Sequence, residues 1–198
     1  MKRKIIKRTF DFILSSILII LLIIPFVCIS LIIIISTKES PIYLSKRIGQ
    51  NKKIFIMPKF RTMRKETPQL ATHLLKNSNE YLSNIGSLLR KTSIDELPQF
   101  FNVLAGNMSV VGPRPHMIKE NEKYLKSIDK FMVRHFIKPG ITGLAQVNGY
   151  RGEIETNLDI VNRIKFDINY IENWSLLLDL KIITLTVFNL FRGEKKAY

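Results

Sequence analysis

The most prominent hydropathy feature of the chain is a nearly unbroken apolar stretch over residues 13–35. Only five residues interrupt it: Ser15, Ser16, Pro25, Cys28 and Ser30. About 20 apolar residues are enough for a helix to span a bilayer, and a core helix of so small a domain is rarely apolar on every face. A signal peptide fits less well, because the stretch is long and no small-residue cleavage site follows it. The pattern predicts a membrane-embedded helix.

Basic residues flank this stretch on both sides. Five Lys and Arg precede it within residues 2–8, and five follow it within residues 38–53, where Glu39 is the only acid. Lys and Arg near membrane ends mark the cytoplasmic side, so a re-entrant helix that enters and leaves on one face fits better than a span. Pro25 removes a backbone donor near the middle and is the expected membrane break. An ordinary kinked transmembrane helix is the alternative.

The remaining residues, 38–198, show shorter patterns. Strands are predicted over 42–44 and 53–57 around a turn at 49–51, and a loop over 137–153, which holds Pro139 and four glycines. Helices are predicted over 67–90, 93–104, 117–136, 158–173 and 176–191. The last helix suits the membrane interface; a helix that caps the core is the alternative.

Together these patterns predict a mixed α/β, mostly helical fold in two parts. Residues 1–37 form a re-entrant membrane helix with a basic N-terminus. Residues 38–198 form a small cytoplasmic domain with short strands and interfacial amphipathic helices.

Charge narrows the choice of partner. The chain carries 31 Lys and Arg against 16 Asp and Glu, a net charge of +15, which implies a nucleic acid, anionic lipid or phosphorylated substrate. The single cysteine, Cys28, excludes an intrachain disulfide or a cysteine-based metal site. The histidines, at 73, 116 and 135, lack zinc-ligand spacing.

Two adjacent carboxylates, Asp95 and Glu96, stand at a predicted helix start behind Arg90 and Lys91. One interpretation is structural: Ser93 and Glu96 have the spacing of a capping box. The other is chemical. A carboxylate beside cations stays ionised and can attack phosphorus, while a second carboxylate can hold a divalent metal.

Three further segments present groups suited to phosphate. Arg114 lies in Val111-Gly-Pro-Arg-Pro115, where two prolines stiffen the backbone. The glycine-rich segment 138–152 has neither Walker nor dinucleotide-binding spacing, and Lys59-Phe-Arg-Thr-Met63 follows a predicted strand. For Arg114 a surface arginine in a plain turn is the alternative.

Five motifs in order resemble one family over essentially the whole chain: the bacterial sugar transferases, the monotopic polyprenyl-phosphate phosphoglycosyl transferases. The motifs are Lys59-Phe-Arg-Thr-Met63, Asp95-Glu96-Leu-Pro-Gln99, Phe101-Asn-Val-Leu104, Val111-Gly-Pro-Arg-Pro115 and Lys138-Pro-Gly-Ile-Thr-Gly143. The resemblance implies that Asp95 attacks the β-phosphate of a UDP-sugar and releases UMP. Polyprenyl phosphate then takes the phosphosugar from Asp95.

The resemblance also implies the roles of individual residues. Asp95 and Glu96 form the catalytic dyad and hold Mg²⁺. The implied phosphate-binding residues are Arg90, Arg114, Arg151, Lys59 and Lys138. The implied nucleotide-sugar loop contains Gly140, Thr142, Gly143 and Gln146.

Three features depart from the family pattern. Ile24 precedes Pro25 where many members have serine, and Leu144 stands where many have tryptophan. Longer relatives carry additional transmembrane helices and a soluble domain before this unit, so the chain is expected to be the catalytic unit alone. Residues 146–153 and 195–198 are most similar to the branch that transfers glucose 1-phosphate to undecaprenyl phosphate, which favours a hexose; an N-acetylated sugar is the alternative.

The implied partners are a UDP-sugar, undecaprenyl phosphate, membrane lipids, downstream glycosyltransferases and a second copy of the chain, with no nucleic acid. The implied location is the cytoplasmic face of the bacterial inner membrane, at the start of exopolysaccharide, capsule, O-antigen or glycoprotein glycan assembly. A membrane-anchored nucleic-acid-binding module explains the charge but not the carboxylate pair, and requires salt-dependent binding. A noncatalytic membrane scaffold leaves UDP-sugars unchanged.

Overall fold

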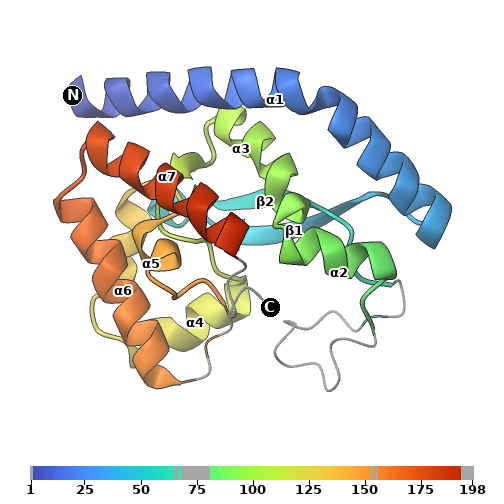
Figure 1. Cartoon of the computed structure of the whole chain (residues 1–198). Coiled ribbons are helices and arrows are strands. Elements are labelled where there is room, and N and C mark those ends of the chain that lie inside the picture. Colours follow the sequence, from blue (N-terminus) through green and yellow to red (C-terminus); the bar gives the residue numbers. More distant parts are fainter. Residues whose placement is uncertain (1, 65–66, 68–80, 153, 155, 193–198) are drawn as a thin grey trace.

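The computed structural model describes residues 2–64, 67, 81–152, 154 and 156–192, and it is mostly helical with two short two-stranded sheets (Figure 1). The mixed, mostly helical class is therefore confirmed. The α-helices are α1 (Lys2–Thr37), α2 (Asn84–Lys91), α3 (Phe100–Ala105), α4 (Ile118–Ser127), α5 (Leu144–Val147), α6 (Asn157–Glu172) and α7 (Leu176–Arg192). The strands are β1 (Ile42–Ile48), β2 (Ile54–Phe60), β3 (Ser109–Val111) and β4 (Gly140–Thr142). Short 3₁₀ turns are η1 (Gln50–Lys52), η4 (Ile94–Gln99) and η5 (Phe131–Phe136).

Helix α1 contains the whole apolar stretch, with Pro25 inside it. It runs along one side of the molecule and bends in its second half (Figure 1). Among the described residues it is the one helix long and apolar enough to cross a membrane, by length and composition. Near its start, Lys7 pairs with Asp179 of α7; near its end, Ile33 is fully buried in a cluster with Phe60 and Leu89. Both halves of the helix therefore contact the same folded body.

The β1–β2 hairpin places Lys59 at the edge of the core. The strands are antiparallel, with Ile42 opposite Phe60 and Ile48 opposite Ile54. Asn51 adopts a left-handed conformation in the connecting turn (φ 52°), which an asparagine tolerates better than most residues. The predicted strands and turn are confirmed, although both strands are longer than expected.

Some backbone segments approach each other so closely that only glycine fits between them. Strands β3 and β4 pair in parallel, and a Cβ on Gly140 would lie 2.1 Å from the backbone nitrogen of Gly112. Residues 137–153 were expected to form a loop, but they contain β4 and the single-turn helix α5. The prediction failed because strand pairing to β3 depends on a distant segment.

Two predicted helices differ from the structure. The helix expected over 117–136 ends at Ser127, and η5 follows after Lys130, whose positive φ of 58° cannot continue a helix. The helix expected over 93–104 is η4 followed by α3, because Pro98 cannot donate a backbone hydrogen bond. Of the helix expected over 67–90, residues 84–90 are helical in α2, and 82–83 are not; residues 68–80 lie outside the described residues. The predictions for α6 and α7 are confirmed to within about one residue.

The main core lies between α1, α6, α7 and the two sheets. Its fully or nearly fully buried members are Phe55, Met57, Phe100, Val103, Met108, Val110, Val111, Tyr170 and Ile182. One carboxylate is buried among them. Asp179 accepts hydrogen bonds from Lys7 Nζ (2.7 Å), Tyr170 Oη (2.7 Å) and Trp174 Nε1 (3.1 Å). Asp179 thus joins α1, α6 and α7.

We expect Asp179→Ala to destabilise the protein by about 3–5 kcal/mol, because the Lys7 ammonium loses its closest anionic partner, and Tyr170 and Trp174 each lose a hydrogen-bond acceptor. Thermal unfolding of the purified protein in detergent measures the effect. Asp129→Asn removes an exposed carboxylate and should change stability by less than about 0.5 kcal/mol. Equal melting temperatures for Asp179→Ala and the wild type would show that α1 does not depend on this contact.

Candidate functional site

The carboxylate pair lies in η4 with both side chains buried. Asp95 is 3% exposed and Glu96 4%. Glu96 accepts two hydrogen bonds from Arg114, from Nη2 to Oε1 at 2.6 Å and from Nη1 to Oε2 at 3.1 Å, and a third from Lys59 Nζ at 2.7 Å. Lys59 is 4.0 Å from Asp95 Oδ2. Two cations from distant segments therefore meet at the pair.

The two carboxylates differ in how their charge is balanced. Burial raises the pKa of Asp95 to about 6, with Glu96 adding to the effect and Lys59 opposing it. Burial acts in the same direction on Glu96, but Arg114 and Lys59 outweigh it and hold the pKa of Glu96 well below its ordinary value. Among the described residues, Asp95 Oδ1 has no hydrogen-bond partner. Glu96 is thus a paired carboxylate that stays ionised at neutral pH, and Asp95 is the carboxylate whose Oδ1 has no hydrogen-bond partner among the described residues.

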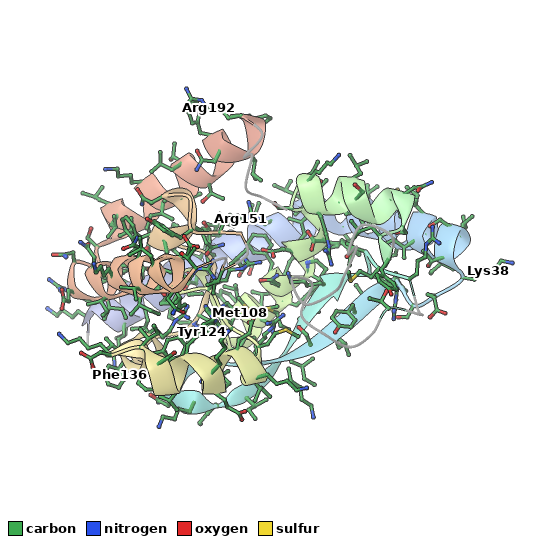
Figure 2. All side chains as sticks on the ribbon, turned by 90° about the horizontal axis from the view of Figure 1, so that it is seen from below. Lys38, Met108, Tyr124, Phe136, Arg151 and Arg192 are labelled. Carbon is green, nitrogen blue, oxygen red and sulfur yellow. The ribbon has the colours of Figure 1, made fainter. Side chains whose placement is uncertain are left out.

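Two more arginines approach from either side. Arg151 Nη2 donates to Ser93 Oγ (2.5 Å), and Arg90 Nε donates to Thr62 Oγ1 (3.0 Å). Arg90 and Arg151 also act electrostatically on Asp95 and Glu96, respectively. In Figure 2, Arg151 lies near the centre of the molecule, where side chains from several elements meet.

The helix-capping interpretation of this segment is wrong. Ser93 is in a left-handed conformation (φ 59°), and among the described residues its side chain makes no capping hydrogen bond to η4. Its hydroxyl is instead used by Arg151. The alternative of a free surface arginine is also wrong for Arg114, which is engaged by Glu96.

A second set of charges holds Arg114 and Arg151 in place. Arg134 Nη2 donates to the backbone oxygen of Arg114 (2.6 Å) and pairs with Asp167 of α6 (3.0 Å), with both side chains about 3% exposed. Arg163, one helical turn before Asp167, donates to the backbone oxygen of Gly152 (2.8 Å), next to Arg151. Sequence reasoning missed these three residues. The spacing of Arg163 and Asp167 marks them as polar positions of the amphipathic helix α6, and Arg134 lies in η5; burial cannot be read from such a pattern.

The predicted loop residues divide between backbone packing and a cavity. A Cβ on Gly143 would lie 2.3 Å from the backbone oxygen of Gly112, so this glycine permits close packing. Thr142 and Gln146 line a cavity of about 150 Å³ that also reaches Glu96 and Arg151. Lys138 is elsewhere: it lies near Gly106, Arg8 and Asp11 at the α1 side of the molecule.

The donor set fits a divalent cation only in part. In the part of the chain that the structure describes, no three His, Cys, Asp or Glu side chains are grouped closely enough to hold a metal. Asp95 Oδ1 offers one oxygen ligand beside Glu96. Mg²⁺ commonly binds one or two carboxylates and completes its shell with water and phosphate oxygens, and the pair fits that mode.

Comparison with known proteins gives one consistent result. Residues 2–193 match the family described as bacterial sugar transferase. The chain is 42% identical over 196 residues to a UDP-glucose:undecaprenyl-phosphate glucose-1-phosphate transferase of Escherichia coli (strain K12), and 47% identical over 196 residues to one of Klebsiella pneumoniae; each comparison covers 98% of the chain and 42% of the relative. A UDP-N-acetylgalactosamine-undecaprenyl-phosphate N-acetylgalactosaminephosphotransferase of Aeromonas hydrophila is 35% identical over 190 residues, covering 95% of the chain and 44% of the relative. The chain therefore spans about two fifths of the length of these relatives.

The pKa values of Asp95 and Glu96 are shifted in opposite directions, so substitutions of the two residues should have opposite effects on stability. A carboxyl with a raised pKa destabilises the fold as the pH rises from its ordinary value of 3.8 to about 6. Asp95→Asn should therefore stabilise the protein at pH 8 by about 1–3 kcal/mol, and the gain should disappear below about pH 4.

Glu96 has the opposite sign, since its lowered pKa contributes stability above its ordinary pKa of 4.5 that is lost as the pH falls. Glu96→Gln should destabilise the protein at pH 8 by about 3–5 kcal/mol, because Arg114 and Lys59 lose their ionic partner. Melting temperatures of both variants across pH 4–8 measure the two effects. Melting-temperature shifts of the same sign for the two variants at pH 8 would contradict the opposite pKa shifts of Asp95 and Glu96.

Proposed function

Because the chain belongs to the bacterial sugar transferase family, we propose that it transfers a sugar 1-phosphate from a UDP-sugar to undecaprenyl phosphate and releases UMP. The observation that carries the proposal is the buried carboxylate pair surrounded by Lys59, Arg90, Arg114 and Arg151. Cations gathered around a buried site are suited to a diphosphate. The Asp95 carboxylate among them, whose Oδ1 has no hydrogen-bond partner among the described residues, is suited to attack phosphorus.

Asp95 is the proposed nucleophile. An oxygen of its carboxylate forms a bond to the β-phosphorus of the UDP-sugar, and the bond from that phosphorus to the bridging oxygen breaks. UMP leaves with the electron pair, and the phosphosugar remains on Asp95. At a pKa of about 6, the carboxylate is mostly ionised at neutral pH, so it needs no base to activate it.

The second step returns the enzyme to its starting state. An oxygen of undecaprenyl phosphate attacks the same phosphorus, and the bond to Asp95 breaks with its electron pair returning to the carboxylate. The lipid product is a polyprenyl diphosphate sugar. Two displacements at one site predict that UMP departs before the lipid acceptor reacts.

The role of Glu96 is to fix the cations. Its three short contacts hold Arg114 and Lys59 beside Asp95, which preorganises positive charge where the diphosphate must bind. Asp95, with Glu96, would supply the protein oxygens for Mg²⁺, which when bound neutralises charge on the diphosphate. A further contact of the sugar phosphate falls to Arg90, which acts electrostatically on Asp95.

We propose a hexose, glucose first, as the sugar. Both of the relatives with 42% and 47% identity named above carry glucose in their names, and the relative with 35% identity carries N-acetylgalactosamine. An N-acetylated hexose is accordingly the second donor to test. The product would initiate assembly of an exopolysaccharide, capsule, O-antigen or glycoprotein glycan.

The membrane arrangement we propose is monotopic, with α1 entering and leaving on the cytoplasmic face. Support comes from its contacts. Arg8 in the first half donates to the carbonyls of Val103 and Leu104, and Phe26 in the second half packs against Phe60 and Phe101. One folded body cannot lie on both sides of a bilayer, and these contacts lie at both ends of the helix. Basic residues on both flanks agree with a single cytoplasmic side.

The topology prediction uses single cysteines in a Cys28→Ser background. Lys4→Cys and Ser40→Cys should both resist a membrane-impermeant maleimide in intact cells, since both flanks face the cytoplasm. After lysis both should react, which is the control for accessibility. Labelling of one position and protection of the other in intact cells would establish a span and refute the monotopic arrangement.

The mechanistic prediction concerns Asp95→Asn. Loss of a covalent nucleophile should lower UMP release by about 10⁴-fold or more, although the fold is retained. The matched control Glu122→Gln alters an exposed acid on α4 and should release UMP at the wild-type rate. Mass spectrometry of wild type incubated with UDP-glucose and Mg²⁺, without acceptor, should show a hexose phosphate on the peptide that contains Asp95. Substantial turnover by Asp95→Asn would exclude the covalent scheme.

A further inference from the structure

A cavity opens beside the carboxylate pair and continues away from it under α7. Its walls come from η4, α3, β4, α5 and α7. Glu96, Arg151 and Ser93 lie at the polar part of its lining, and the apolar part is formed by Leu97, Phe100, Ile141, Val147 and Leu190. The volume is about 150 Å³, small beside the roughly 300–1,000 Å³ of pockets that enclose a whole ligand. The cavity therefore suits one end of a larger molecule.

Most polar groups in the apolar part are already used by the protein. Thr186 Oγ1 contacts the backbone oxygen of Ile182 at 2.8 Å and Thr142 Oγ1 at 2.6 Å, so each threonine hydroxyl proton has an acceptor. Gln146 Nε2 donates to the backbone oxygen of Ile141 (3.1 Å). Gln146 Oε1 has no hydrogen-bond partner among the described residues, so this wall keeps one polar atom beside its apolar side chains. Most of the lining away from Glu96 and Arg151 is apolar, which suits an aliphatic chain.

Helix α7 separates this cavity from an outward apolar face. Thr186, Asn189 and Leu190 line the cavity, while Val187, Phe188 and Phe191 are 49%, 50% and 88% exposed. The end of α7, marked by Arg192, projects from the body of the molecule (Figure 2). Aromatic and aliphatic side chains exposed in this way are expected at a lipid surface. An apolar chain leaving the bilayer has to pass only one helix, about 10 Å across, to reach the cavity.

We propose that this cavity receives the head of the polyprenyl phosphate acceptor, with the phosphate toward Arg151 and the first isoprene units between Leu97, Phe100, Ile141, Val147 and Leu190. The assignment rests on the proposed function and adds the place where the acceptor binds. Arg151 has the planar guanidinium that pairs well with phosphate. An acceptor held there has its phosphate oxygens beside η4, where they can attack the phosphorus carried by Asp95.

Filling the cavity should impair the second displacement alone. Val147→Phe adds bulk to the wall on α5, and Leu190→Phe adds it from α7. We expect each to raise the KM for a short-chain polyprenyl phosphate in detergent micelles by about tenfold or more, on the scale of a misfitted apolar pocket. Release of the first UMP per enzyme from UDP-glucose without acceptor should stay within about twofold of wild type. The matched control Val187→Phe makes the same change on the outer face of α7 and should alter neither step.

Measuring UMP release and acceptor transfer separately distinguishes the possible outcomes. If first-turnover UMP release falls together with acceptor transfer in a variant that keeps the wild-type melting temperature, the cavity serves the nucleotide sugar and the assignment is wrong. An unchanged KM for the acceptor in both variants also overturns it. Wild-type protein that releases no UMP from any UDP-sugar would instead refute the proposed function. Leu190 is partly exposed, so Leu190→Phe tests the assignment even if Val147→Phe does not fold.

Discussion

A carboxylate with 4% exposure remains ionised only where cations are brought to it, and Glu96 obtains them from distant segments. Lys59 arrives from the end of β2, and Arg114 from the turn that follows β3. An unpaired buried charge would cost several kcal/mol, so the hairpin and the parallel β3–β4 pair must form in register for the site to exist. The narrow approach of Gly112 to Gly140, too close for any side chain, is part of that requirement.

The same packing gives the adjacent residues Asp95 and Glu96 different electrostatic surroundings. Glu96 takes up the hydrogen bonds of Arg114 and Lys59, and Asp95 is left with the weaker contact of 4.0 Å to Lys59. The pKa of Asp95 therefore rises and that of Glu96 falls. In the proposed mechanism, the carboxylate that is costly to keep charged is also the one that bonds to phosphorus. Stability and the proposed reactivity are therefore opposed at Asp95.

Local signals in the sequence predicted the parts that local interactions determine. The apolar run predicted α1, amphipathic periodicity predicted α6 and α7, and the adjacent acids indicated the segment that forms η4. Groups whose role depends on distant contacts were not predictable in this way. Asp167 and Arg163 look like ordinary polar positions of α6, yet they are buried and hold Arg134 and the backbone beside Arg151. Lys138 stands in a family motif, but the path of the chain carries it toward α1, away from the carboxylate pair.

Helix α1 also contacts the segments that form the site. Arg8 donates to the last carbonyls of α3, the helix that directly follows η4, where a cation is favourable to the helix dipole. Three residues later, Asp11 Oδ1 accepts a hydrogen bond from the backbone nitrogen of Val110 in β3 (3.1 Å), and β3 leads into the turn that presents Arg114. One turn of α1 therefore touches both segments whose side chains meet at Glu96. A displacement of this helix would move the carboxylate and its arginine relative to each other, so the position of α1 and the assembly of the site are coupled through these few polar contacts.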